Sequence, residues 1–393
     1  MSAVTWDRKP LGDVADLCLG KMLDQKKNRG EPFPYLANVN VRWGAFELDD
    51  LRVMRFEPKE MDRYGLKFGD IVMCEGGEPG RCAIWKDQVP GIMIQKAIHR
   101  IRPKEILDYR FLFYSLLHLG QTKVFDQYFT GATIKHLPGE KLAKVEIEFP
   151  PLPIQQRIAG ILSTYDELIE NSQRRIKILE AMARGLYREW FVHFRFPSHE
   201  NHPRKASALG DIPQGWEVGR LDDVLVLQRG FDLPKGARVE GSVPIIAASG
   251  ITGFHNEAKV RAPGVVTGRS GTIGEVLYVQ EDFWPLNTSL WVKEFPNGEP
   301  LYAYYLLLSL DLKQFNSGAA VPTLNRNDIH GVNVMVPPRN LQKRFQEIVG
   351  TMFSQSRTIT LQIQNLRRTR DLLLPRLLSG QIEVEELSEG IAA

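Results

Sequence analysis

Two groups of basic, amide and hydroxyl side chains, one in each half of the chain, are the candidates for chemistry. Lysine and arginine neutralise phosphates, whereas arginine, asparagine, glutamine, serine and threonine can pair with base edges in the major groove. The first group comprises Lys21, Lys26, Lys27, Arg29, Asn38, Asn40, Arg42, Trp43, Gln95 and Lys96. The second comprises Arg229, Lys235, Ser249, Thr252, Arg269, Ser270, Thr272, Asn287 and Thr288. Together they indicate nucleic-acid binding, although each alone also fits a solvated loop residue and the glycine-rich loops also fit hairpin turns.

The sequence carries no recognisable catalytic or cofactor motif. It has no G-x-G pattern, no Walker A motif and no Asp/Asn-Pro-Pro-Tyr/Phe tetrapeptide. His199 and His202 are one residue too close to match the zinc-protease spacing, so they would not share a helix face as ligands. The acid-x-Lys tripeptides at 57–59 and 311–313 are too short to indicate a nuclease. We therefore predict no catalytic residue, no metal ligand and no cofactor in this chain.

A long helix is predicted from Pro150 to Pro197. Its apolar residues recur in steps of three and four, which places them on one face for packing against a partner helix. The prolines at its start block helix upstream, and about 40 residues at ~1.5 Å each make a rod of roughly 60 Å. The positions predicted to face the partner are Ile161, Leu168, Ile176, Leu179 and Leu186.

The partner helix is predicted in the same chain, because the sequence repeats itself 187 residues later. Between residues 131–158 and 318–345, eight of 28 positions are identical, including Gln155 and Gln342. Such an internal repeat indicates duplicated structure. The partner-facing positions of the second helix are Ile348, Ile359, Ile363, Leu366 and Leu373. We expect the two helices to pair as an antiparallel coiled coil.

The remaining sequence predicts two globular domains of mixed helices and strands, each preceding one helix. The predicted fold class is therefore α+β, with two α/β domains alternating with two long helices and related by a pseudo-twofold repeat. The predicted segments are domain 1 at 1–149, the central helix at 150–197, a linker at 198–215, domain 2 at 216–336, the C-terminal helix at 337–384 and an acidic tail at 385–393.

Composition fits a globular protein. The chain has 393 residues, of which 43% are hydrophobic and 25% charged, and a net charge of +3 permits a nucleic-acid partner without requiring one. Its three cysteines have no metal-ligand spacing, which favours reduced thiols. No apolar run is long enough to cross a bilayer and no signal-peptide pattern is present, so we expect a cytoplasmic protein without membrane contact.

Three stretches resemble the specificity subunit of type I restriction-modification enzymes: PPLPIQQRIAGILSTYDELIENSQRRIKILEAMARGLYREWF, PPRNLQKRF and IPQGWEVGRLDDV. The resemblance covers essentially the full chain. It implies that each domain is a target recognition domain reading one half of a bipartite, asymmetric site in double-stranded DNA. It also implies that the coiled coil fixes the spacer between half-sites. Two methyltransferase subunits, which would carry S-adenosylmethionine, and motor-nuclease subunits are the implied partners of a non-catalytic subunit.

Other functions fit parts of the sequence. One is the recognition subunit of a modification-only methyltransferase complex without a nuclease. Another is a coiled-coil scaffold without direct DNA reading, which would explain the helices but not the two polar, loop-rich domains. A self-contained methyltransferase or nuclease would need a cofactor or metal motif that the sequence lacks.

Overall fold

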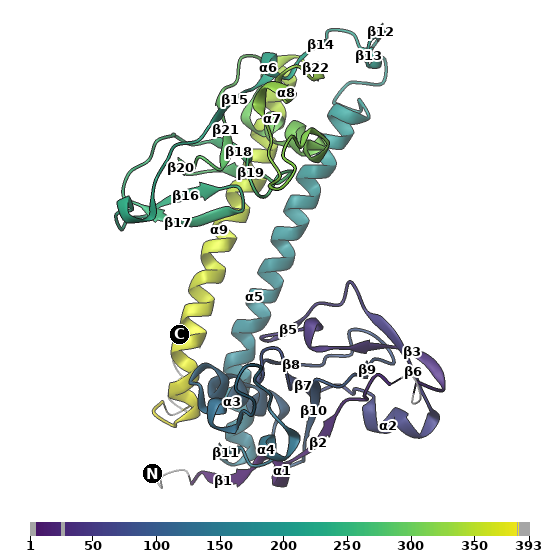
Figure 1. The fold of residues 1–393 in the computed structure, drawn as a ribbon, viewed down its shortest axis with the longest axis vertical. Helices are drawn as coiled ribbons and strands as arrows, with labels where there is room; N and C mark the ends of the chain where they lie inside the picture. The colour runs from purple at the N-terminus through teal and green to yellow at the C-terminus, as the bar shows by residue number, and fades with distance from the viewer. Residues whose placement is uncertain (1–4, 25–27, 383, 385–393) are drawn as a thin grey trace. The chain divides into compact units, whose positions relative to one another are not determined.

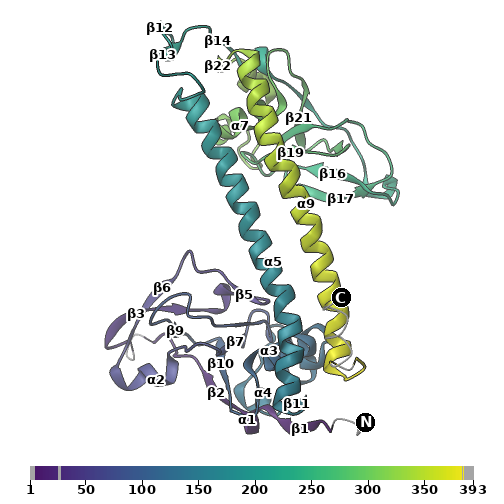
Figure 2. The same ribbon diagram turned by 180° about the vertical axis from the view of Figure 1, so that it is seen from behind.

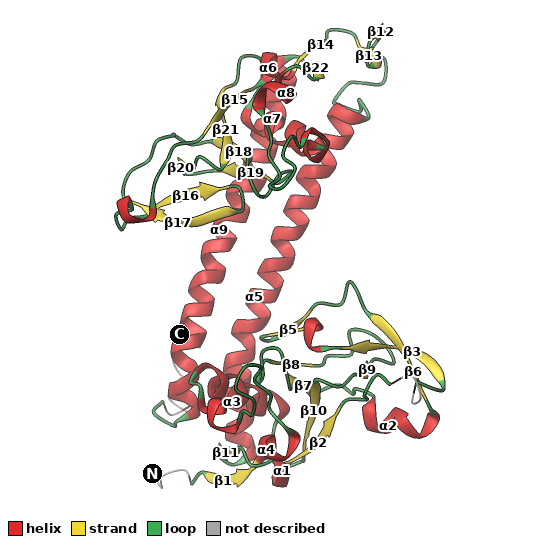
Figure 3. Ribbon diagram, viewed as in Figure 1, coloured by secondary structure: helices red, strands yellow, loops and turns green. Residues whose placement is uncertain are grey.

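The computed structural model describes residues 5–24, 28–382 and 384, and it divides into two compact units. Unit 1 comprises 1–171 and 362–393, and unit 2 comprises 172–361. Both boundaries fall inside the two long helices, α5 (Leu152–Tyr187) and α9 (Arg339–Leu378), so each unit holds part of each helix (Figure 1). Strands and helices are mixed in both units, which confirms the predicted α+β class (Figure 3). The predicted acidic tail and the candidates Lys26 and Lys27 lie outside the described residues.

Unit 1 is built on a four-stranded antiparallel sheet of order β2-β10-β7-β8, with a second sheet of order β6-β3-β9 and a β1-β11 pair. Its strands are β1 (Asp7–Pro10), β2 (Ala15–Leu19), β3 (Glu31–Leu36), β4 (Val41–Arg42), β5 (Ala45–Phe46), β6 (Arg52–Phe56), β7 (Ile71–Cys74), β8 (Cys82–Ile84), β9 (Met93–Ile94), β10 (Ile98–Pro103) and β11 (Glu146–Phe149). Its shorter helices are α1 (Leu11–Val14), η1 (Asn38–Asn40), η2 (Pro58–Glu60), α2 (Met61–Tyr64), α3 (Tyr109–Gln121), η3 (Val124–Tyr128) and α4 (Gly139–Leu142).

Unit 2 repeats this plan with sheets of order β15-β21-β18-β19 and β17-β16-β20 and a β14-β22 pair. Its strands are β12 (Arg204–Ser207), β13 (Gly210–Pro213), β14 (Glu217–Arg220), β15 (Val226–Arg229), β16 (Val243–Ala247), β17 (Gly250–His255), β18 (Gly264–Gly268), β19 (Val276–Val279), β20 (Trp284–Pro285), β21 (Ser289–Glu294) and β22 (Asn333–Val336). Its shorter helices are η4 (Arg188–Val192, a π-turn that ends the first long helix), α6 (Leu221–Val224), η5 (Lys235–Ala237), α7 (Pro300–Ser309), η6 (Leu312–Phe315) and α8 (Arg326–His330).

The predicted repeat is confirmed in the pairing of the strands. In unit 1, β3 pairs antiparallel with β6 and parallel with β9. In unit 2, β16 pairs antiparallel with β17 and parallel with β20. Strands β7 and β18 occupy the same place in the two four-stranded sheets and are buried at every residue, as expected for strands covered on both faces. The two units therefore share one topology.

A buried glutamine at the start of each long helix makes the same three hydrogen bonds in both units. Gln155 donates from Nε2 to the carbonyls of Ile106 and Pro150, and its Oε1 accepts from Asp108 N. Gln342 donates to the carbonyls of Asn297 and Pro337, and its Oε1 accepts from Glu299 N. Both side chains are at most 1% exposed, so each amide ties a helix start to a neighbouring loop inside the core.

Both long helices contribute to the core of each unit. In unit 1, the core includes Ile158 and Leu162 of α5 with Leu374 and Leu377 of α9. Arg370 of α9 also pairs with Asp166 of α5, which accepts a hydrogen bond from Tyr114 Oη at 2.6 Å. The unit 2 core includes residues from both helices, Ala183 and Tyr187 of α5 with Phe345 and Val349 of α9, and also Trp190 of η4.

Burial varies along the predicted partner-facing stripe. Leu168 is 46% exposed and Ile348 is 37% exposed, so these two predictions are wrong, and the adjacent Ile169 and Val349 are buried instead. An α-helix has 3.6 residues per turn, so a stripe drawn with a 3.5-residue repeat drifts around the helix and moves burial to a neighbouring residue. Of the other positions, Ile359 and Ile363 are buried, and the half-buried ones are Ile161, Ile176, Leu179, Leu186, Leu366 and Leu373.

The predicted linker at 198–215 contains a two-stranded hairpin, β12–β13, which the sequence analysis did not predict. Its first strand carries Arg204, whose guanidinium lies 5.5 Å from the ring centre of Phe194 beyond the helix end. Figure 2 shows the hairpin from behind. None of the helices among the described residues combines the length and hydropathy that a membrane crossing requires.

Candidate nucleic-acid interface

Each four-stranded sheet has an edge strand, β2 or β15, with a candidate residue at or just beyond its end, Lys21 or Arg229. Lys21 follows β2 and bridges Gln95, while Phe231 follows β15 and bridges Leu286, both in parallel register. A glycine precedes each bridge because the backbones approach closely: a Cβ at Gly20 would lie 2.3 Å from Gln95 O, and one at Gly230 would lie 2.2 Å from Leu286 O. The same backbone frame thus presents different side chains in the two units.

Lys21 is a structural residue and does not reach solvent, so its predicted phosphate contact is wrong. It is 3% exposed, and its Nζ donates to Arg55 O at 2.9 Å and to Glu60 Oε2 at 2.6 Å. Burial by itself would raise the pKa of Glu60, but the hydrogen bonds from Lys21 and from Glu57 N outweigh it and hold this pKa below its usual value. The acidic partner lies 39 residues away along the chain, so no local sequence pattern indicated it.

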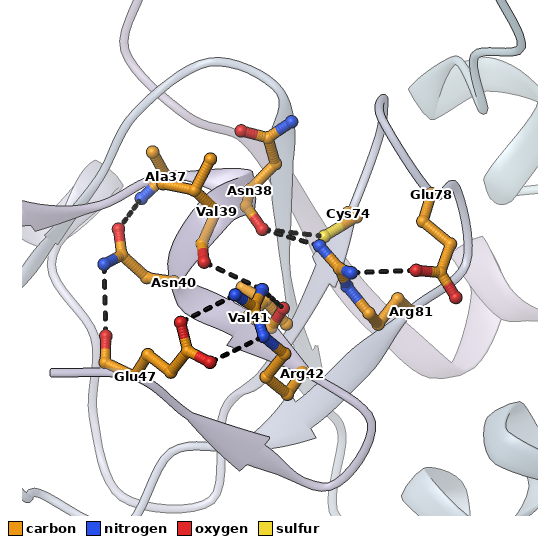
Figure 4. A network of polar contacts seen from close by, with 10 residues as sticks. All are labelled: Ala37, Asn38, Val39, Asn40, Val41, Arg42, Glu47, Cys74, Glu78 and Arg81. Carbon is orange, nitrogen blue, oxygen red and sulfur yellow. Dashed lines mark hydrogen bonds and ion pairs between the residues drawn. The ribbon is translucent and has the colours of Figure 1, made fainter. Parts of the chain in front are cut away.

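The loop from Asn38 to Trp43 is held by its own polar residues (Figure 4). Asn40 is 7% exposed, accepts from Ala37 N at 3.0 Å and donates to Glu47 O at 3.1 Å, so the prediction that it contacts DNA is also wrong. Arg42 binds the Glu47 carboxylate through Nε at 2.9 Å and Nη2 at 2.6 Å. This surface ion pair occupies the guanidinium that we predicted as a phosphate ligand.

A second loop of unit 1, residues 75–81, joins the first through Asn38. Arg81 donates to Asn38 O at 2.9 Å and to Glu78 Oε2 at 2.8 Å (Figure 4). Glu78 also accepts from Trp43 Nε1 at 2.9 Å. Below them, burial raises the pKa of the Cys74 thiol, with Arg81 acting in the opposite direction. Glu78 and Arg81 were not among the residues predicted from the sequence.

Unit 2 joins three predicted residues in one chain of hydrogen bonds that includes the Asp232 carboxylate. Arg229 pairs with Asp232 at 3.2 Å, and Asn287 Nδ2 donates to the same carboxylate. Arg269 then donates to Asn287 O at 3.2 Å. Half of the Arg229 side chain (51%) remains exposed, so this guanidinium can still reach a ligand. Asp232 is the residue that sequence reasoning missed, because Arg229 ends a strand and a spacing of three predicts contact only on a helix.

Most other candidates lie at the surface of their own unit. Thr288 ties two loops together, because its hydroxyl accepts from Ala248 N at 3.4 Å and its carbonyl accepts from Arg269 N at 2.8 Å. Thr252 donates to Ile245 O at 3.4 Å. The exposed candidates are Arg29, Trp43, Lys235, Ser249, Thr252 and Thr272, and the half-buried ones are Asn38, Gln95, Lys96, Ser270 and Thr288.

The equivalent loops of the two units place their charges differently: residues 75–81 carry Glu75, Glu78 and Arg81, whereas residues 269–275 carry Arg269 and Glu275. Glu75 and Glu78 stand where unit 2 has Arg269 and Thr272, in each case 194 residues later. The equivalence is structural, because Gly76 bridges His136 in unit 1 and Ser270 bridges Thr323 in unit 2. A carboxylate accepts from the amino group of cytosine, whereas a guanidinium donates to guanine. The two loops therefore suit different bases. Within the described part of the chain, no cluster of His, Cys, Asp or Glu could hold a metal ion.

Comparison with known proteins identifies relatives along nearly the whole chain. A family model described as "Type I restriction modification DNA specificity domain" matches residues 3–181 and 213–367. The type I restriction enzyme MjaIX specificity subunit of Methanocaldococcus jannaschii is 26% identical, over 97% of this chain and 94% of that protein. The HindI specificity subunit of Haemophilus influenzae is 21% identical, over 81% of this chain and 87% of that protein.

A solved structure has the same fold. The S subunit of a type I restriction-modification system from M. genitalium superposes with a TM-score of 0.62 at 19% sequence identity, covering 96% of this chain and 97% of that one. At this identity the likeness concerns the fold.

Proposed function

The chain belongs to the type I restriction modification DNA specificity family, and on this premise we propose that it is the non-catalytic DNA-recognition subunit of a type I restriction-modification enzyme. Each unit reads one half of a bipartite, asymmetric site in double-stranded DNA. The main support for this proposal is that the two units share one strand topology but have differently charged loops at equivalent positions. A shared frame with different loops is what two readers of different half-sites require.

In unit 2, base reading falls to Arg269 and Asn287, and Arg229 neutralises a phosphate beside them. Asp232 holds the Arg229 guanidinium and the Asn287 amide, and the backbone carbonyl of Asn287 holds the Arg269 guanidinium. This prior ordering lowers the entropic cost of binding DNA. In unit 1, Asn38 and Glu78 read bases next to Trp43. Arg81 positions the Glu78 carboxylate and the backbone of Asn38, while the Asn38 side-chain amide donates to Gly76 O at 3.4 Å.

The long helices set the spacer between the half-sites as an antiparallel coiled coil. Their shared contribution to each core and the Asp166–Arg370 pair support this role. A helical turn inserted between Glu170 and Arg175 is expected to lengthen the unread spacer or to abolish binding. An unchanged spacer would contradict the role of the helices as a ruler.

The subunit also holds two methyltransferase subunits, which bind S-adenosylmethionine, and motor-nuclease subunits. The names of the relatives, all specificity subunits of type I restriction enzymes, support this assignment.

The test is co-expression with the methyltransferase subunit followed by genome-wide methylation mapping. The expected result is one bipartite motif with two unlike halves, together with a gel shift of a duplex carrying that motif and no methyl transfer by the isolated chain. A methylated motif that does not depend on this subunit, or a complex that assembles without binding DNA, would favour a scaffold function for this chain. Methylation without any associated nuclease would identify a modification-only complex.

A further inference from the structure

A short exposed turn occurs in both units at equivalent positions and belongs to neither group of candidate residues. In unit 1 it spans 130–136 and is closed by two hydrogen bonds of 2.8 Å, one in each direction, between the backbones of Thr130 and His136. In unit 2 it spans 317–323 and is closed by Ser317 N donating to Thr323 O at 2.9 Å. Each turn lies beside the charged loop of its own unit through the bridges Gly76–His136 and Ser270–Thr323.

Both turns are tight and begin with a required glycine. A Cβ at Gly131 would lie 2.2 Å from Ile134 O, and a Cβ at Gly318 would lie 1.9 Å from Val321 O. Gly131 also has a φ of +90°, which disfavours any side chain. The shared pattern is Gly-Ala, one variable residue and an aliphatic residue.

The aliphatic residue at the tip of each turn is exposed to solvent. Ile134 is 65% exposed and Val321 is 53% exposed. One exposed aliphatic side chain needs no explanation. Two exposed aliphatic side chains at the same position of two equivalent turns do need an explanation, because the neighbouring loops differ in charge. The fold does not require them, because neither packs in a core.

We propose that both turns are sequence-independent DNA contacts, in which Ile134 and Val321 press into the minor groove of their respective half-sites. This inference rests on the proposed function. The loops that differ between the units suit the bases, which differ between the half-sites. The turn that both units share suits the features of duplex DNA that both half-sites have in common.

The chemistry of the tip favours the minor groove over phosphate or base-edge contact. No charge is common to the two tips, since Lys135 of unit 1 is replaced by Pro322 in unit 2, and Thr133 is replaced by Ala320. Phosphate binding needs polar groups, and an aliphatic contact in the major groove would select the thymine methyl and so depend on sequence. In the minor groove, aliphatic side chains serve as wedges between base steps. The turn also continues the surface of the loop that carries Glu78 or Arg269.

The test compares Ile134→Ala and Val321→Ala in the complex with the methyltransferase subunit. Ile106→Ala (40% exposed) and Val239→Ala (54% exposed) are matched controls from the same units. Fluorescence anisotropy at one salt concentration measures binding to a duplex with the mapped site and to a scrambled duplex. We expect each tip variant to bind both duplexes on the order of tenfold more weakly, with the controls unchanged and the methylated motif unaltered.

Three results would overturn the inference while leaving the proposed function intact. The first is unchanged DNA affinity of both tip variants, and the second is a changed methylated motif. The third is weaker association with the methyltransferase subunit while the affinity for DNA is unchanged. The last would make the turn a protein-binding element. Failure of the unaltered complex to bind either duplex would instead overturn the proposed function, and with it this inference.

Discussion

Units 1 and 2 are alike in backbone and buried polar contacts and unlike in exposed loops. The glutamines at 155 and 342 make identical hydrogen bonds, and Gly20 and Gly230 meet equivalent carbonyls. Yet Glu75 and Glu78 of one loop correspond to Arg269 and Thr272 of the other. The comparison separates residues that build the frame from residues free to vary with the DNA sequence read.

The largest expected effect comes from removing a frame residue. Gln155→Ala and Gln342→Ala each leave two carbonyls and one N–H unpaired in the core, so each is expected to destabilise its own unit by roughly 2–4 kcal/mol. Chemical unfolding, monitored by hydrogen exchange in each unit, measures the loss of stability. The exposed Gln156→Ala is the control. A large loss in one unit with none in the other would show that the frames are not equivalent.

The second prediction contrasts two basic residues at equivalent sheet edges. Lys21→Met removes the partner of Glu60 and is expected to cost roughly 2–3 kcal/mol of stability, without changing the DNA affinity of the folded protein. Arg229→Met is expected to cost about 0–1 kcal/mol, because its ion pair is exposed, but to weaken DNA binding and reduce its salt dependence. Thermal unfolding measures the effect on stability, and anisotropy titrations measure the effect on DNA binding. Weaker DNA binding by Lys21→Met, or a large loss of stability in Arg229→Met, would contradict the assignment of Lys21 to the frame and of Arg229 to the DNA interface.

The third prediction concerns the charged loops. Arg269→Ala is expected to relax one base position, in the half-site of unit 2 alone, by roughly 1–3 kcal/mol of discrimination. Glu78→Gln should act only on the half-site of unit 1. Methylation mapping of each variant gives the answer, with the exposed Arg261→Ala as control. Relaxation of both half-sites by one substitution would contradict separate readers.

The smallest effect is a pH dependence confined to unit 1. The pKa of Glu60 is lowered in the folded state, so its contribution to stability is present above the usual pKa of 4.5 and is lost as pH falls through the folded-state value. Unfolding of unit 1 between about pH 6 and pH 3.5 is expected to depend less on pH in Lys21→Met than in the unaltered chain. An unchanged pH profile would mean that Lys21 does not set this pKa.

The repeat, the two long helices and the α+β class could be predicted from the sequence. The spacing of apolar residues is a local property of the chain, and a duplication is found by comparing the two halves of the sequence directly. The sequence did not predict which polar residues are buried. Lys21 and Asn40 resemble surface residues until Glu60 and Glu47 are placed beside them. The hairpin β12–β13 was missed because its strands are short and polar and resemble a linker.

Exchanging residues 216–336 for the corresponding segment of a relative, in a complex with the methyltransferase subunit, tests the central claim most directly. The account predicts that methylation mapping returns one altered half-site, with the other half-site and the spacer unchanged. Alteration of both halves, or of neither, would contradict it.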